Sequence, residues 1–296
     1  MAEQTLKRRR KAAASRKRAL ASHAKRIARG EIAAPKIVAV KAAAVAASAG
    51  TLIAEGDSWF DYPLHDVLRD LEDSYGFEVE SVAHKGDAVE DMAYNDGQLD
   101  DFARRVEKVL RSGVIPKAIL LSGGGNDVAG DEFAVLLNHA LSSIAGLNES
   151  IVTGLVDERL HDAYVTILSA ITKVCSSLTQ ETVPIVVHGY DYPVPDGRGF
   201  LGGWGPLPGP WLEPGFRQKG YEAMASRRSI VIALIDRFNT MLQRVAGHAP
   251  FAHVHYLDLR GTLPTGPNYK DWCANELHPT PKGFEAVTKK FVAILP

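Results

Sequence analysis

A serine and a histidine near opposite ends of the chain are the residues best suited to chemistry. Ser58 lies in the segment Glu55-Gly56-Asp57-Ser58-Trp59, at the end of the first predicted strand. Glycine permits a tight turn there, and a serine that starts a following helix faces the positive end of the helix dipole. His278 lies in a loop before the last predicted helix, where an imidazole can act as a general base near neutral pH. A Gly-Asp-Ser turn also occurs as an ordinary cap, so a nucleophile-and-base pair needs support from other residues.

Two more blocks follow predicted strands and could stabilise a developing oxyanion. Gly86, in residues 84–87, offers a backbone N–H that no side chain covers, and Asp87 could cap the next helix. Asn126 follows three glycines in residues 122–127, and its amide is a neutral hydrogen-bond donor. Each block alone is also what an ordinary strand-to-helix turn looks like. The glycines form no nucleotide-binding pattern, and we expect no cofactor.

The elements that must position these blocks alternate along the chain. Candidate helices span residues 228–245 and the segment after Thr280-Pro281, where Thr280 would be the cap and Pro281 the first helical residue. Strands that alternate with helices predict a parallel sheet with helices on both faces and a ligand site at the carboxyl ends of the strands. The predicted strands are apolar, rich in β-branched residues and end in Gly, Asp or Pro; they lie within 51–58, 77–86, 117–127, 184–193 and 253–261.

Residues 193–216 interrupt this alternation. Glycine and proline recur there too often for a helix or a central strand. The segment carries Trp204 and Trp211, and two interpretations stay open: a lid or binding loop, or a surface loop that its aromatic residues anchor to the core. Trp59, Tyr190, Tyr192, Trp204 and Trp211 are the candidate substrate-binding residues.

The overall composition is that of a globular protein with one sizeable core. The chain has 296 residues, of which 46% are hydrophobic, and no apolar run is long enough to span a membrane. Two distant cysteines predict no disulfide framework. His253 and His255 would share one face of a strand, but no third ligand accompanies them, so we expect no metal site.

Residues 1–49 are expected to be a basic extension with an Ala-rich linker, followed by one catalytic domain over residues 50–296. Residues 1–30 contain eleven Lys or Arg and a single acidic residue, Glu3. Three interpretations stay open: a solvated extension, an arm that binds nucleic acid or anionic lipid headgroups, and an organelle transit peptide. The segment lacks the apolar stretch of a secretory signal, which favours a cytoplasmic protein.

Together the four blocks resemble those of the SGNH (GDSL-type) hydrolase superfamily, over about residues 50–296. The resemblance implies a three-layer α/β/α fold, with a flavodoxin-like parallel five-stranded sheet, and the hydrolysis of esters or thioesters. It implies that Ser58 attacks the carbonyl and that His278 takes the serine proton. The oxyanion would be held by the backbone N–H groups of Ser58 and Gly86 and by the side chain of Asn126.

The chain departs from that family at the residue that orients the histidine. The family usually has an aspartate three residues before the histidine, and this chain has Asn275. Three interpretations follow: Asn275 orients His278 through its carbonyl, Glu276 or Asp271 supplies a carboxylate through a shifted loop, or the site is impaired or repurposed. The expected substrate is a small-molecule or glycan ester. The alternative is a binding module with a degenerate hydrolase fold, which the basic extension targets to nucleic acid or to an anionic membrane.

Overall fold

A sheet of five parallel strands forms the centre of the protein. The computed structural model describes residues 48–95, 97–203 and 207–296, and residues 49–296 form one compact unit. The strand order, β2-β1-β3-β6-β7, is that of flavodoxin-like doubly wound sheets, so the predicted α/β fold is confirmed. Each predicted strand is present: β1 (Gly50–Glu55), β2 (Phe77–Ser81), β3 (Ala118–Leu121), β6 (Ile185–His188) and β7 (Val254–Leu257). The basic extension and its predicted partners lie outside the described residues.

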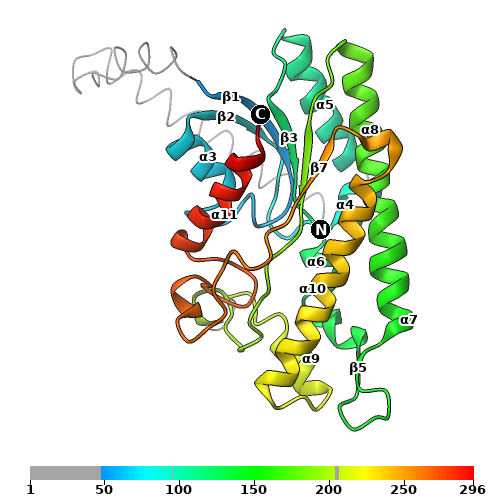
Figure 1. Cartoon of the computed structure of the whole chain (residues 1–296), viewed down its shortest axis with the longest axis vertical. Coiled ribbons are helices and arrows are strands. Elements are labelled where there is room, and N and C mark those ends of the chain that lie inside the picture. The colour runs from blue at the N-terminus through cyan, green and yellow to red at the C-terminus, as the bar shows by residue number, and fades with distance from the viewer. Residues whose placement is uncertain (1–47, 96, 204–206) are drawn as a thin grey trace, which may run out of the picture. The chain divides into compact units, whose positions relative to one another are not determined.

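Helices cover both faces of the sheet (Figure 1). Helices α3 and α11 pack against each other on one face, and α8 packs against α4, α5 and α10 on the other. A π-helical segment, Thr153–Leu160, leads into α8, and a short antiparallel pair joins β4 (Leu137–Asn138) to β5 (Gly146–Leu147). The helices are α3 (Val67–Tyr75), α4 (Val89–Tyr94), α5 (Gln98–Arg111), α6 (Gly125–Val128), α7 (Glu149–Val152), α8 (His161–Leu178), α9 (Glu213–Gln218), α10 (Met224–Ala246) and α11 (Pro281–Ile294).

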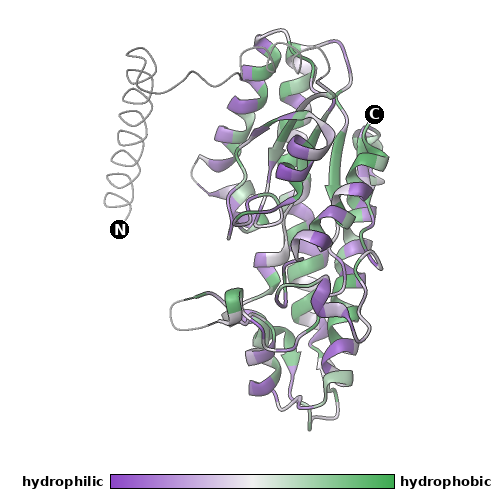
Figure 2. Cartoon of the chain, turned by 90° about the vertical axis from the view of Figure 1, so that its left-hand side faces the viewer, coloured by the Kyte–Doolittle hydropathy of each residue, from purple (hydrophilic) through white to green (hydrophobic). Residues whose placement is uncertain are grey.

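Burial explains why the central strands are apolar on both faces. Every residue of β3 and β6 is buried, whereas the edge strand β2 has no buried residue. Figure 2 shows hydrophobic colour along the strands and alternating polar and apolar turns along the helices. In the described part of the chain, no helix has the length and apolarity needed to cross a membrane.

The two predicted helices are present. The predicted span 228–245 lies inside α10, and α11 begins as expected because the Thr280 hydroxyl accepts the N–H of Gly283 at 3.2 Å and Pro281 follows it. In its described part, the Gly- and Pro-rich segment 193–216 contains one short 3₁₀ turn, Phe200–Gly202, and reaches α9, which has a proline in its first turn.

The expectation that Ser58 starts a helix is wrong. The backbone N–H groups of Phe60 and Asp61 both donate to the carbonyl of Asp57, at 3.0 and 3.1 Å, so Ser58 lies in a single tight turn. The next helix, α3, begins only after Asp66, whose side chain accepts the N–H of Arg69. The turn, and not a helix dipole, therefore holds the serine.

Candidate active site

Ser58 and His278 meet at the carboxyl edge of the sheet. Ser58 lies in the turn after β1, and His278 lies in the loop before α11. The Oγ atom of Ser58 is 2.7 Å from Nε2 of His278. The loop is closed on itself, because the N–H of Ala274 donates to the carbonyl of His278 at 2.9 Å and Cys273 pairs with Pro279. The two residues predicted to act together are thus in hydrogen-bond contact.

The surroundings of Asn275 determine which nitrogen of His278 carries the proton. The Oδ1 atom of Asn275 accepts the backbone N–H groups of Leu277 and His278, at 3.0 and 2.9 Å. A backbone N–H can only donate, so this side-chain atom is the oxygen and not the nitrogen. The same oxygen lies 2.9 Å from Nδ1 of His278. Nδ1 must therefore donate, and the lone pair of Nε2 faces the hydroxyl of Ser58.

Tyr62 is a site residue that the sequence analysis missed. Its hydroxyl lies 3.0 Å from Nδ2 of Asn275, from which it accepts a hydrogen bond. Its ring stacks on the imidazole of His278, with centroids 4.3 Å apart and planes 22° apart. Trp211 meets the same imidazole edge-on at 5.4 Å. The aromatic run after Ser58 was the available signal, because Tyr62 stands in the same short loop as the serine.

Glu276, offered from the sequence as an alternative partner of the imidazole, is used elsewhere. Its carboxylate accepts four backbone N–H groups of the Gly- and Pro-rich segment at 2.7–3.1 Å, those of Gly197, Trp211, Leu212 and Glu213. Asp271 ends a short helical turn, and its backbone carbonyl accepts the hydroxyl of Thr280. The interpretations that gave Glu276 or Asp271 to His278 are therefore wrong: Asn275 holds Nδ1.

Burial determines the protonation state of His278. His278 is only 7% exposed, and loss of hydration lowers its pKa to about 3. The oxygen on Nδ1 belongs to a neutral amide, so no charge there offsets this effect. The imidazole is neutral, and able to accept a proton, over the whole physiological pH range.

The carboxylate of Asp57 fixes the serine turn from inside. Its Oδ1 atom accepts the N–H of Trp59 at 3.0 Å and the hydroxyl of Ser122 at 2.8 Å. The hydroxyl of Tyr190 donates to Oδ2, and it accepts the N–H of Gly125 at 3.2 Å. Asp57 thus ties the ends of β1, β3 and β6 together behind the nucleophile, and does not face the imidazole.

Gly86 lies in the loop after β2, and Asn126 lies in the first turn of α6. Nδ2 of Asn126 donates to the carbonyl of Asp87 at 2.9 Å, which ties α6 to the loop of Gly86, and an amide nitrogen has a second N–H. Gly86 has a φ of 89°, which favours glycine, and no atom lies within 4 Å of where its Cβ would stand. Ser58 and Asn126 border the same cavity.

The predicted cap of the helix after Gly86 is wrong. Helix α4 is capped by Asp127, whose carboxylate accepts the N–H groups of Val89 and Glu90 at 2.8 and 3.1 Å. Burial raises the pKa of Asp127 to about 6. Asp87 instead accepts a hydrogen bond from Gln98 at 2.7 Å. Asp127 therefore holds α6, which carries Asn126, against the start of α4.

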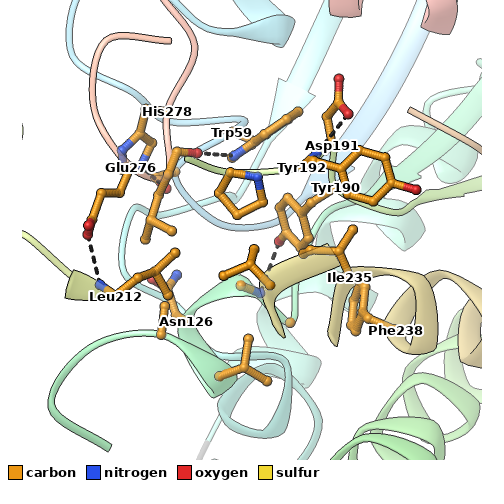
Figure 3. A pocket seen from close by; sticks show the side chains of 18 of the residues that line it. Trp59, Asn126, Tyr190, Asp191, Tyr192, Leu212, Ile235, Phe238, Glu276 and His278 are labelled. Atoms are coloured by element: carbon orange, nitrogen blue, oxygen red, sulfur yellow. Dashed lines mark hydrogen bonds between the residues drawn. The ribbon is translucent and has the colours of Figure 1, made fainter. Parts of the chain in front are cut away.

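Ser58 and His278 border a cavity that α10 lines as well, and Figure 3 shows His278 on one side of it and α10 on the other. Of the predicted substrate-binding residues, Trp59, Tyr190 and Tyr192 line it, Trp211 packs on His278, and Trp204 lies outside the described residues. The indole N–H of Trp59 donates to the carbonyl of Leu277 at 3.2 Å. Side chains of α10 also line the cavity, among them Ile235 and Phe238.

Within the residues that the structure covers, no three His, Cys, Asp or Glu side chains are grouped to hold a metal ion. Cys175 and Cys273 are both buried free thiols.

Several solved hydrolases are similar to the chain in structure. A protein of Slackia heliotrinireducens assigned to the SGNH hydrolases is 11% identical, over 84% of this chain and 100% of its own, with a TM-score of 0.47. An extracellular lipase from Streptomyces rimosus is 17% identical, over 83% and 99%, with a TM-score of 0.45. A mutant acetylxylan esterase from Geobacillus stearothermophilus is 14% identical, over 84% and 94%, with a TM-score of 0.42. No family model matches the chain, and neither does any curated protein.

Proposed function

We propose that this protein is a serine-dependent hydrolase of carboxylic esters that works through an acyl-enzyme intermediate. One observation carries the proposal: Ser58, His278 and Asn275 form a chain of hydrogen bonds in which each donor and acceptor is determined. A serine hydroxyl becomes a competent nucleophile when a neutral imidazole nitrogen accepts its proton. The fixed oxygen of Asn275 supplies that tautomer.

In the proposed reaction, Nε2 of His278 takes the proton of Ser58 as Oγ forms a bond to the ester carbonyl carbon. The carbonyl oxygen becomes negative and accepts hydrogen bonds from the N–H groups of Ser58 and Gly86 and from the amide of Asn126. Nε2 then gives its proton to the leaving alcohol as the ester C–O bond breaks. Water repeats these steps on the acyl-serine, which releases the acid and restores the hydroxyl.

Asn275 distinguishes this site from a Ser-His-Asp triad. Its carbonyl holds the imidazole in the required tautomer, as an asparagine does in Cys-His-Asn enzymes, but it offers no negative charge to the imidazolium. We therefore infer an enzyme with a weaker base, whose histidine nevertheless stays deprotonated in mildly acidic solution.

Hydrolysis of p-nitrophenyl butyrate tests the proposal. Ser58→Ala should abolish turnover, whereas Ser176→Ala, which removes an exposed hydroxyl on α8, should leave it unchanged. A fluorophosphonate should label the wild-type protein once, and mass spectrometry should locate the label on Ser58. Full activity of Ser58→Ala, or labelling at another residue, would contradict the proposed nucleophile.

A further inference from the structure

We propose that the cavity against α10 is the acyl-binding pocket of this enzyme and that it selects uncharged aliphatic acyl chains of medium length. The inference rests on the proposed function, because it assumes an ester carbonyl at Ser58. Beyond the proposed function, the inference states that the cavity holds the acyl group, that an uncharged aliphatic chain fits it, and that α10 limits the length of that chain.

One face of α10 forms an apolar wall of the cavity. Val231, Leu234, Ile235 and Phe238 follow the spacing of a single helical face, and each is at least 92% buried. Figure 3 shows Ile235 and Phe238 projecting into the space that His278 borders from the opposite side. These side chains therefore face the reacting carbonyl across the cavity.

The wall runs away from the nucleophile. Phe238 is at the near end, because its ring lies 5.7 Å from that of Tyr190, whose hydroxyl bonds to the serine turn. Val231 stands seven residues earlier, about 10 Å further along the helix axis. Phe133 also lines the cavity, on the side near α9, because its ring packs on the ring of Phe216 in that helix with centroids 5.0 Å apart. A chain bound along this wall passes two turns of helix before it meets the far end.

The lining provides little for a charged or hydroxylated acyl group. Among the described residues that form it, the ionic side chains are Asp57, Asp191 and Glu276, and none is Lys or Arg. Asp191 accepts the N–H groups of Tyr192, Gly261 and Leu263, so its oxygens are engaged in the same way as those of Asp57 and Glu276. An anionic chain would find no counter-charge, and a sugar acid would leave hydroxyls unpaired.

Acyl length at a constant leaving group tests the inference. For p-nitrophenyl acetate, butyrate and octanoate, kcat/KM of the wild type should rise by up to about fourfold for each methylene buried, and it should fall for palmitate. Val231→Phe, which shortens the pocket, should lower the octanoate-to-acetate ratio at least tenfold. Val231→Ala should move the optimum to longer chains. Ile232→Phe is the matched control, because Ile232 points outward from the same helix and is 41% exposed.

Two outcomes would overturn the inference: an octanoate-to-acetate ratio that Val231→Phe leaves unchanged, with or without an equal loss on all esters, or a wild type that prefers acetate. An equal loss would place the alcohol, and not the acyl group, against α10. If Val231→Phe fails to show a cooperative thermal transition, Val231→Ala alone decides. Failure of the proposed function looks different, because no ester would then be cleaved and a fluorophosphonate would not label Ser58.

Discussion

The side-chain oxygen of Asn275 lies 2.9 Å from Nδ1 of His278 and accepts two backbone N–H groups at the same time. The backbone donors hold the amide in one orientation, and the amide in turn holds the imidazole. An asparagine at this place therefore supplies the geometry of a triad without its charge. Separate substitutions can measure the effects on the pKa of His278, on Tyr62 beside it and on the Gly- and Pro-rich segment that Glu276 binds.

Asn275→Asp should restore the missing charge. A carboxylate at hydrogen-bond distance favours the imidazolium and should raise the pKa of His278 by about 1–3 units from its value of about 3. The neutral base is lost as the pH falls through this pKa, so the acid limb of kcat/KM should move upward by the same amount, and kcat at pH 8 should rise. Rates for butyrate between pH 4 and pH 9 check this: the wild-type rate should stay flat across the range, whereas the rate of the variant should fall at its acid end, with the exposed Asn268→Asp as control. An acid limb that stays in place would show that residue 275 does not control the base.

Tyr62→Phe should lower kcat by about three- to tenfold and leave KM nearly unchanged. The variant keeps the ring on His278 but removes the hydroxyl that accepts the amide N–H of Asn275, which is worth about 1 kcal/mol. Tyr62→Ala removes both contacts and should cost more. Tyr94→Phe, on an exposed tyrosine, serves as the control. A fall in thermal stability of Tyr62→Phe with kcat unchanged would make Tyr62 a packing residue and not a positioning one.

The strands could be predicted because each is an apolar run that must be buried on one or both faces and that ends where the chain turns. The position of Ser58 could not be predicted to the same detail. The expected helix is replaced by a tight turn that the carbonyl of Asp57 closes, and the carboxylate of Asp57 is held by Ser122 and Tyr190, which follow β3 and β6. Those partners are far away in the sequence, so local propensity carries no trace of them.

The sequence predicted which residues form the site, but it did not predict most of their contacts. Ser58 and His278 stand out by type and place, whereas Tyr62 matters only through its contact with a loop at the other end of the chain. The sequence alone left three candidate partners for the imidazole, the side chains of Asn275, Glu276 and Asp271. Likewise, the periodicity of α10 predicts an apolar face, but not whether that face contacts the core or an open cavity.

Glu276→Gln should weaken substrate binding and thermal stability more than it weakens the chemistry. A glutamine presents one oxygen and one NH₂ group, and the NH₂ group would oppose backbone N–H groups that now donate to the carboxylate. The segment that carries Trp211 should then detach from the histidine loop. We expect a raised KM, a melting temperature lower by several degrees and continued labelling of Ser58. Glu222→Gln, at an exposed position, is the control. A loss of kcat near 10⁴ at constant KM would instead assign Glu276 to the imidazole.

Glu55→Gln should stabilise the protein in alkaline solution and have little effect in acid. Glu55 is 1% exposed at the end of β1, and burial raises its pKa from 4.5 to about 8. The folded protein therefore keeps a proton that the unfolded chain releases above pH 4.5. The stability that this proton provides is complete below that pH and is lost as the pH rises towards 8.

The amide of Glu55→Gln is neutral at every pH and keeps an oxygen for the N–H of Gly56, which now bonds to the carboxyl group at 2.8 Å. The difference in unfolding free energy between variant and wild type should therefore grow between pH 5 and pH 8.5 in urea titrations. The titration of His278 is common to both proteins and cancels in this difference. Glu181→Gln, on an exposed glutamate, should show no such trend. A difference that is constant with pH would mean that Glu55 is ionised in the folded protein, and a negative charge would then stand directly behind the serine turn.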